Sequence, residues 1–224
     1  MILELATVVG LAQQCAPTVA VETLVSVVHT ESHFNPYAIG VNAKGVAAPN
    51  PGDRVSAAAV ARSLIARGYN IDLGLGQINS ANLRWLGLSV DDAFDPCRNL
   101  AAAARVLASN YLSVARSSPS AEVAIATAMS MYNTGSRSRG FGNGYVSRVY
   151  ASSSIVVPAI RREAIPEPAA LPAPVTPEPT VTKPSAGDRS PRVQEAWDTA
   201  AGAQTASLMV FGGASNSSPK GQAE

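Results

Sequence analysis

One glutamate near the N-terminus of the chain has the placement of a general acid. The stretch from Thr18 to Ser32 is apolar at helical intervals, and a turn of about 100° per residue puts Glu31 inside the apolar arc, which comprises Val21, Leu24, Val27 and Val28. A carboxyl that faces a core or a cleft loses hydration, which raises its pKa. Such a group can hold a proton near neutral pH, as an acid that cleaves a glycosidic bond must. The alternative is a helix-end glutamate that turns outward to water.

Two histidines on the same stretch raise the question of a metal site. His29 and His33 are four positions apart, a spacing that can hold zinc from one helix face. Both fall opposite the apolar arc, so we expect them to face solvent. The order His-Thr-Glu-Ser-His also differs from the metalloprotease order, in which glutamate follows the first histidine, and the chain has no third histidine. We therefore expect two exposed polar side chains and no metal.

Most glycosidases need a second carboxylate. Asp72, just before Gly74 and Gly76, is the best candidate in the sequence. Its place beside a glycine-rich loop favours a solvated aspartate, so we expect Asp72 to lie in water.

The elements that must position these residues are mainly helices. Serine or threonine precedes several apolar periodic stretches, and glycine follows them, as at helix starts and ends. The expected helices are Leu3–Gln14, Thr18–Ser32, Ser56–Gly68, Ser80–Gly87, Cys97–Ala115, Ser120–Gly135 and Gly144–Ser152. Strand patterns are weak. The predicted class is mainly α, with at most a small β-hairpin between residues 40 and 78.

A change of composition near residue 155 divides the chain. Nine of the sixteen prolines fall between Pro158 and Pro191, a density that excludes helix and sheet and favours an extended linker. We expect a folded domain over residues 1–155, a proline-rich flexible linker over 156–192 and a disordered segment over 193–224. In that last segment, Trp197 and Phe211 could dock on a partner protein.

Composition argues against two classes of protein. A formal charge of +1 and the lack of a basic block argue against nucleic-acid binding. No apolar run reaches the roughly 18 residues of a transmembrane helix.

The first basic residue is Lys44, so the basic start of an export signal is not recognisable. Cys15 and Cys97 allow either one disulfide or two buried thiols, and composition does not decide between them.

Several short motifs in order give a family resemblance. They are Glu31-Ser32, Phe34-Asn35-Pro36-Tyr37-Ala38, Gly74-Leu75-Gly76-Gln77-Ile78-Asn79, Asp95-Pro96-Cys97-Arg98-Asn99-Leu100, Tyr132-Asn133-Thr134-Gly135 and Gly144-Tyr145-Val146. Over roughly residues 10 to 150 the series resembles the soluble lytic transglycosylase domain. The resemblance implies a fold like that of goose-type lysozyme.

The resemblance implies a role for each matching residue. Glu31 matches the family's catalytic glutamate, and Ser32 matches the serine that hydrogen-bonds and orients it. Tyr145 stands where the family has a tyrosine near the glutamate; packing in the core is its alternative role.

Three further residues match the family's substrate-binding motifs. Gln77 matches the glutamine of a Gly-Leu-Met-Gln motif that lines the sugar cleft, although Gly76 replaces the methionine here. Asn133 would hydrogen-bond an N-acetyl group of the substrate. Tyr132 precedes it in the family's Ala-Tyr-Asn motif, with Met131 in place of alanine, and either contacts substrate or packs in the core.

Two more segments narrow the resemblance to the transglycosylase subunit of type IV secretion and conjugation systems. They are Ala12-Gln13-Gln14-Cys15-Ala16-Pro17 and Pro36-Tyr37-Ala38-Ile39-Gly40-Val41. The resemblance implies a periplasmic enzyme whose substrate is the glycan strand of peptidoglycan, with other secretion subunits as partners of the C-terminal segment. An oxidising compartment in turn favours a disulfide between Cys15 and Cys97.

The family's chemistry needs one carboxyl and no cofactor. The glutamate protonates the leaving oxygen and then deprotonates the sugar's own primary hydroxyl, which closes onto the anomeric carbon without water. Two alternatives remain open. One is a hydrolytic lysozyme that uses Glu31 with Asp72, and the other is a scaffold that binds peptidoglycan without cutting it.

Overall fold

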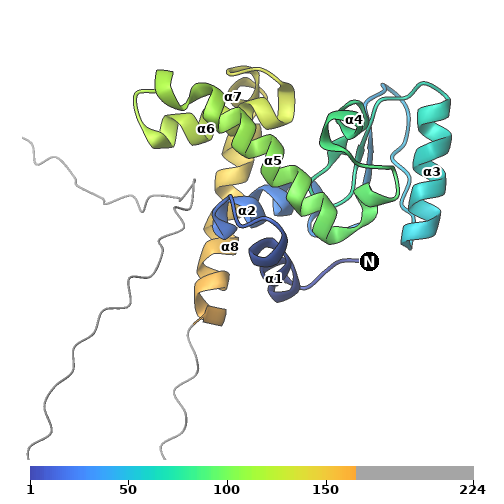
Figure 1. Ribbon diagram of the computed structural model, residues 1–224, viewed down its shortest axis with the longest axis horizontal. Helices are drawn as coiled ribbons and strands as arrows, with labels where there is room; N and C mark the ends of the chain where they lie inside the picture. The colour runs from blue at the N-terminus through green and yellow to red at the C-terminus, as the bar shows by residue number, and fades with distance from the viewer. Residues whose placement is uncertain (165–224) are drawn as a thin grey trace, which may run out of the picture. The chain divides into compact units, whose positions relative to one another are not determined.

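The computed structural model describes residues 1–164. Its longer helices are α1 (Leu5–Cys15), α2 (Val21–Ser32), α3 (Arg54–Ala66), α5 (Pro96–Val114), α6 (Ala121–Thr134) and α8 (Tyr145–Ala164). The shorter elements are helices α4 (Leu83–Leu86) and α7 (Arg139–Gly142), strands β1 (Ile39–Val41), β2 (Ile71–Leu73) and β3 (Ile78–Asn79), and the 3-10 turns Ser80–Asn82, Asp92–Phe94 and Ala115–Ser117. In Figure 1, α5 runs from the side that holds α6 and α7 to the side that holds α3, α4 and the strands. The mainly helical class is confirmed.

The strands form one antiparallel sheet in the order β1-β2-β3, one strand more than the hairpin that the sequence predicted. Leu73 in β2 lies opposite Ile39 in β1 and Ile78 in β3. All three side chains are buried in the core. Because side chains alternate between the faces of a strand, Asp72 is turned to the opposite face of the sheet.

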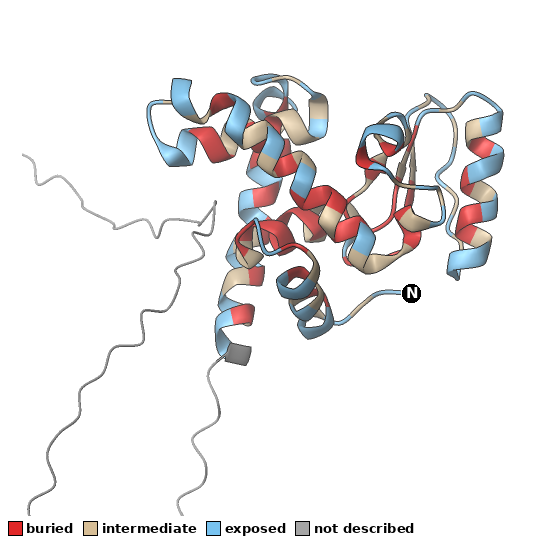
Figure 2. Cartoon of the chain, viewed as in Figure 1, coloured by how far each residue is buried: buried red, intermediate tan, exposed pale blue. Residues whose placement is uncertain are grey.

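α2 is surrounded by other parts of the fold. Residues 23–28 are all buried, including the polar Thr23 and Ser26, because α1, α5 and α8 pack around the helix. The Ser26 hydroxyl is satisfied within the helix, where it donates to Glu22 O at 2.6 Å. Figure 2 shows buried residues along α2 and through the middle of α5. Glu31 is in the last turn of this central helix.

Side-chain caps fix the starts of three helices. Asp95 accepts a hydrogen bond from Arg98 N at the start of α5, and Ser120 accepts one from Val123 N at the start of α6. α3 begins two residues before the expected Ser56, because Asp53 caps it and Ser56 is the reciprocal partner in a capping box.

α8 is longer than the last helix that the sequence predicted. The last helix was expected to stop near Ser152, with the linker from residue 156, but α8 continues to Ala164 and contains Pro158. A proline inside a helix removes one backbone hydrogen bond and costs about 3 kcal/mol. Val156 and Ile160 are buried on either side of Pro158, and this packing opposes that cost. The rest of the expected linker, the 193–224 segment and its docking residues Trp197 and Phe211 lie outside the described residues.

Cys15 at the end of α1 and Cys97 at the start of α5 form a disulfide, with their Cα atoms 5.4 Å apart. The bond joins positions separated by 82 residues. Closing a loop of this length stabilises the fold by about 4 kcal/mol in the chain-entropy account. None of the helices within residues 1–164 combines the length and the apolar character needed to cross a membrane.

Candidate active site

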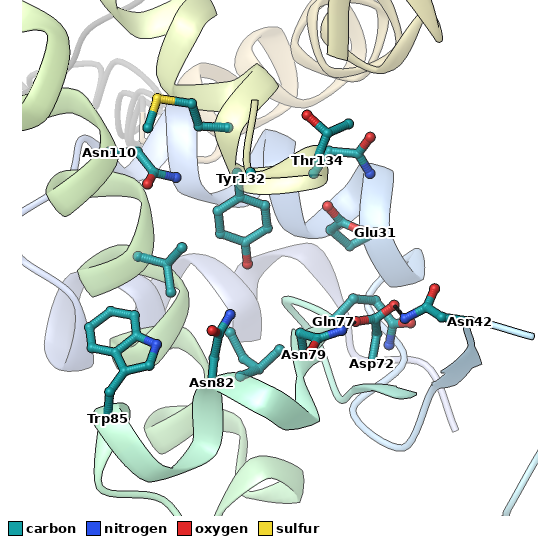
Figure 3. Close-up of a pocket in the computed structure, with 15 residues that line it drawn as sticks. Glu31, Asn42, Asp72, Gln77, Asn79, Asn82, Trp85, Asn110, Tyr132 and Thr134 are labelled. Carbon is teal, nitrogen blue, oxygen red and sulfur yellow. Dashed lines mark hydrogen bonds between the residues drawn. The ribbon is translucent and has the colours of Figure 1, made fainter. Parts of the chain in front are cut away.

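A cleft of about 570 Å³ opens beside Glu31. α2, the sheet, α4, α5 and α6 all contribute to its walls. Figure 3 shows Glu31 and Trp85 toward opposite ends of the cleft, with Tyr132 between them. The lining is rich in amides and carries two carboxylates; its residues are Glu31, Asn42, Asp72, Gln77, Ile78, Asn79, Asn82, Trp85, Val106, Asn110, Met131, Tyr132, Asn133, Thr134 and Gly135.

Glu31 has the properties of a proton donor. Its residue is only half-buried, since it borders the open cleft, but its carboxyl lies deep enough for desolvation to dominate its titration. Burial raises the pKa of Glu31 to about 7; the hydrogen bond from Tyr145 opposes this rise, the nearby Asp72 carboxylate adds to it, and Arg148 opposes it. A carboxyl with this pKa is protonated in a large fraction of molecules at neutral pH.

Tyr145, the first residue of α8, holds Glu31 in place. Its hydroxyl donates to Glu31 Oε1 at 2.5 Å, and its side chain is almost completely buried. Burial and then the charge of Glu31 raise the pKa of Tyr145 well above its ordinary value, so the hydroxyl stays a donor. The guanidinium of Arg148 lies 5.8 Å from the centre of the tyrosine ring.

Ser32 follows Glu31 at the end of α2, and its hydroxyl is turned back along the helix. Its hydroxyl donates to Val28 O, one turn back in α2, at 3.3 Å. A helix-end serine commonly satisfies itself in this way. The hydrogen bond to the Glu31 carboxyl comes from Tyr145, and the orienting role of Ser32 stays a prediction.

Asp72 lines the cleft, which the sequence did not predict. It was expected in water, but it lies in β2 and lines the cleft, half-buried. Asn42 Nδ2 donates to its Oδ2 at 2.8 Å and Asn79 Nδ2 to its Oδ1 at 2.7 Å. Burial raises the pKa of Asp72, and these two hydrogen bonds oppose the rise. The signal that could have found it is the period-two alternation of Ile71, Asp72 and Leu73.

Gln77 shapes the cleft through the backbone of the glycine loop, which we define as residues 74–77. Its Nε2 donates to Gly74 O at 2.9 Å and to Ala38 O at 3.2 Å, and its backbone has a positive φ of 49°. The side chain thus both lines the cleft and ties the glycine loop to the residue before β1.

Gly76, where the family has methionine, is enclosed by neighbours. A Cβ added there would lie 2.8 Å from the Ala103 Cβ and 3.0 Å from the Tyr132 hydroxyl oxygen. The Tyr132 hydroxyl donates to Gly76 O at 2.6 Å, and Gly76 N donates to Asn99 Oδ1 at 2.7 Å. Glycine is therefore the residue that fits this close approach.

Tyr132 and Asn133, at the end of α6, both line the cleft. Burial, followed by the charges of Glu31 and Asp72, raises the pKa of Tyr132 well above its ordinary value, so its hydroxyl stays protonated. Asn133 is exposed and its Oδ1 accepts from Asn143 Nδ2 at 2.8 Å. The structure thus brings Glu31, Tyr145, Gln77, Tyr132 and Asn133 to one site.

Asn99 belongs to one of the family motifs, but no role was predicted for it from the sequence. It is buried in α5, its Nδ2 donates to Leu73 O at 2.9 Å and Ala93 O at 2.7 Å, and its Oδ1 accepts from Gly76 N. A polar residue on the core side of an otherwise alanine-rich helix is the sequence signal that could have found it.

His29 also differs from its expected place. It is half-buried, and its Nδ1 lies 3.0 Å from the Ser152 hydroxyl oxygen, so it joins α2 to α8 instead of facing solvent. Burial, followed by the charge of His33, lowers the pKa of His29. Over residues 1–164, no three histidine, cysteine, aspartate or glutamate side chains are grouped as metal ligands.

Comparison with known proteins agrees with this geometry. Residues 10–149 match the transglycosylase SLT domain. Protein virB1 of Rhizobium radiobacter is 40% identical over 149 residues, which cover 66% of this chain and 62% of that protein. The type IV secretion system protein virB1 of Brucella abortus biovar 1 is 40% identical over 164 residues, covering 68% of each chain. Protein virB1 of Agrobacterium fabrum is 37% identical over 149 residues, covering 66% of this chain and 60% of that protein.

The matched part of the chain thus spans about three fifths of the length of the Rhizobium relative. No solved structure gives a significant match. The domain match runs from within α1 to within α8 and includes each of the cleft residues discussed above. By this match and by the identity to the virB1 proteins, the chain belongs to the transglycosylase SLT domain family.

Proposed function

We propose that this protein is a lytic transglycosylase. Its substrate is the glycan strand of bacterial peptidoglycan, which it cleaves between N-acetylmuramic acid and N-acetylglucosamine, leaving an anhydro-muramoyl end. The observation that carries the proposal is the Glu31 carboxyl, held by Tyr145 at the wall of an amide-lined cleft with a pKa of about 7. Membership of the SLT family supports the same activity.

In this reaction one carboxyl serves twice. Protonated Glu31 gives its proton to the glycosidic oxygen as the bond from that oxygen to the anomeric carbon breaks. The muramic acid's N-acetyl group helps to stabilise the positive charge that develops. The carboxylate of Glu31 then takes the proton of the primary hydroxyl, whose oxygen bonds to the anomeric carbon, and the enzyme regains its protonated form. The nucleophile belongs to the substrate and is already close, so no water is recruited.

The cleft supplies groups suited to an N-acetylated sugar. Amide side chains both donate to and accept from hydroxyl and acetamido groups. Asn133 is exposed on the cleft wall next to Tyr132, in the position from which we propose that it binds the substrate's N-acetyl group. Gln77 supports the opposite wall through the glycine loop. No organic cofactor or metal enters this proposal.

Asp72 favours a second candidate, a hydrolytic lysozyme. It lines the same cleft as Glu31, and its charge contributes to the raised pKa of Glu31. A second carboxylate facing the substrate could activate water or stabilise the positive charge. We rank this function second, because both oxygens of Asp72 already accept hydrogen bonds from asparagine amides.

The products of digestion separate the two functions. Mass spectrometry of muropeptides released from purified sacculi would find anhydro-muramoyl ends for the transglycosylase and reducing ends, heavier by one water, for the hydrolase. We expect anhydro ends. We further expect Glu31→Gln to lower the rate by at least about 10²-fold, and Asp72→Asn to have a much milder effect. Reducing ends, with comparable loss in both variants, would establish the hydrolase instead.

Glu31→Gln also tests the alternative that the protein is a scaffold without catalytic activity. If the protein were only a peptidoglycan-binding scaffold, the parent would release no muropeptides while still binding sacculi. We expect release by the parent and retained binding by Glu31→Gln, since glutamine preserves the shape of the side chain and lacks only its transferable proton.

We also propose that the enzyme opens the wall locally for a type IV secretion or conjugation apparatus in the periplasm. The virB1 names of its relatives support this setting. The Cys15–Cys97 disulfide fits an oxidising compartment. Transfer through the apparatus, measured in a strain that lacks the gene for this protein, should be restored by the parent gene and not by Glu31→Gln. Restoration by Glu31→Gln would separate the secretion role from the enzyme activity.

A further inference from the structure

Trp85 stands apart from the reacting residues. It belongs to the short helix α4 and borders the cleft toward the end opposite Glu31, as Figure 3 shows. Its side chain is 45% exposed, although its neighbours in α4, Leu83 and Leu86, are buried in the core. α4 is therefore anchored by its two leucines and presents the tryptophan at the wall of the cleft.

The indole ring is held in place without being buried. The guanidinium carbon of Arg105, in α5, lies 5.1 Å from the centre of the ring, within the range of a cation–π contact. This contact occupies one face of the indole. The exposed part of the ring borders the cleft, and a ring that already has a contact on one face loses less conformational entropy on binding a flat partner.

Polar groups accompany the ring. Asn82, from the turn before α4, and Asn110, from α5, line the cleft together with Trp85. Nδ2 of Asn110 donates to Ala128 O at 3.5 Å, which ties this amide to α6. Figure 3 shows Asn82 and Asn110 on either side of the space beside the ring.

The aromatic ring of Trp85 is complementary to the apolar face of an aminosugar, and the amides of Asn82 and Asn110 are complementary to its polar edges. In a β-linked N-acetylated pyranose, axial C–H groups form an apolar face, whereas hydroxyl and acetamido groups point outward from the ring edges. The negative face of an aromatic ring attracts C–H groups, and asparagine amides can bond the edges. We propose that Trp85, Asn82 and Asn110 form a saccharide subsite that binds a sugar of the glycan strand away from the bond that Glu31 cleaves.

The subsite would act on binding and not on the chemical step. Its contacts are the same in the ground state and the transition state, so they lower the KM of long strands and leave kcat unchanged. The identity of the ligand rests on the proposed function, whereas the stacking contact can be tested without catalysis.

The sequence offers a direct probe, because it contains only two tryptophans, Trp85 and Trp197. In the full-length chain, Trp197→Phe leaves Trp85 as the only tryptophan, and Glu31→Gln prevents turnover. Titration with β-1,4-linked N-acetylglucosamine oligomers, from the disaccharide to the hexasaccharide, should shift the tryptophan emission to shorter wavelength and saturate. Longer oligomers should bind more tightly, because only they reach from the Glu31 end of the cleft to Trp85.

Substitutions at Trp85 provide a second test of the proposed subsite. Trp85→Ala should weaken hexasaccharide binding about tenfold in calorimetry, whereas Trp85→Phe should retain most of it. Phe141→Ala is the matched control, since Phe141 is 47% exposed and does not line this cleft. Binding of the hexasaccharide with unchanged Trp85 emission and an unchanged affinity of Trp85→Ala would overturn the inference. Absence of binding by any oligomer would overturn it as well.

These experiments distinguish a failure of the proposed subsite from a failure of the proposed function. If the subsite is right and the function is wrong, the oligomers bind at Trp85 but sacculi yield no anhydro ends. If the function is right and the subsite is wrong, anhydro ends form and Trp85→Ala has the KM of the parent on long strands.

Discussion

The Tyr145 hydroxyl donates a hydrogen bond to Glu31 Oε1 across 114 positions of the chain. The two residues meet because the N-terminal end of α8 packs beside the C-terminal end of α2. The bond favours the ionised form of Glu31, whereas burial of the carboxyl favours the protonated form. A carboxyl balanced between the two forms suits a group that must give a proton and then take one back.

Removal of this hydrogen bond should move the pH dependence of the reaction upward. Without the tyrosine hydroxyl, Tyr145→Phe loses a contact that lowers the Glu31 pKa, so that pKa should rise above about 7. The initial cleavage requires protonated Glu31, and the alkaline limb of kcat/KM should therefore move to higher pH. The rate should fall about tenfold or more, because the carboxyl is less well oriented.

The measurement is a pH profile of kcat/KM on a soluble glycan oligomer for the parent and Tyr145→Phe. Tyr111→Phe is a control that removes a tyrosine hydroxyl from α5, outside the cleft. An alkaline limb at the same pH in the parent and Tyr145→Phe would show that the tyrosine only packs in the core.

Glu31 should also reduce the stability of the fold at neutral pH. Its folded-state pKa of about 7 lies above the ordinary value of 4.5, so ionisation favours the unfolded chain. The penalty is absent below about pH 4.5, grows as the pH rises, and reaches at most about 3 kcal/mol above pH 7. Glu31→Gln should therefore melt several degrees higher than the parent at pH 8 and close to it at pH 4.

Thermal melts at the two pH values check this prediction. Glu4→Gln, at an exposed position, is the control for the loss of a glutamate charge. Equal stabilisation by Glu31→Gln at both pH values would contradict an origin in the titration of this carboxyl.

The sequence located the catalytic candidate better than its partners. Glu31 could be found because helical periodicity is local, and four apolar residues within eleven positions define the arc that it joins. The short motifs identified Gln77, Tyr132 and Asn133, which do line the cleft. The motif match also placed Tyr145 where the family has a tyrosine near the glutamate, and the two side chains do meet. Periodicity within either helix carries no information about this contact, because it depends on how the two helices pack.

Two predictions from the sequence, the solvent exposure of Asp72 and the end of the last helix, were wrong for identifiable physical reasons. Asp72 was assigned to water because glycines follow it, whereas pairing with β1 and β3 places it in a strand beside Asn42 and Asn79. α8 was ended early because proline disfavours helix locally, but burial of Val156 and Ile160 against the core outweighs that local preference. In both cases contacts with distant parts of the chain decide the local structure.

Asn99 should be necessary for the stability of the glycine loop. Asn99→Ala leaves Gly76 N and Ala93 O without the partner that now satisfies them, and Leu73 O loses one donor. Each buried polar group left unpaired costs about 1–3 kcal/mol, so the loss should be at least about 2 kcal/mol in urea unfolding. Asn110→Ala, which removes a single 3.5 Å hydrogen bond at a half-buried position, should cost less than about 1 kcal/mol. Equal, small losses in both variants would show that the loop does not depend on Asn99.

We expect the catalytic domain to end at residue 164 instead of residue 155. Truncation after Ala164 keeps α8 whole, and all of the proposed site residues precede it, so cleavage of isolated sacculi should match that of the full chain. Truncation after Ile155 removes Val156 and Ile160, which are buried at 2% and 7% exposure. Loss of these two side chains should destabilise the fold by about 3–5 kcal/mol. The shortened α8 would then hold Tyr145 less firmly against Glu31, and activity should fall with stability. Thermal melts and muropeptide release, measured on both truncations, test the boundary. Full activity and stability after truncation at Ile155 would show that the last turns of α8 are dispensable, whereas an inactive but folded chain ending at Ala164 would show that the catalytic domain needs residues beyond it.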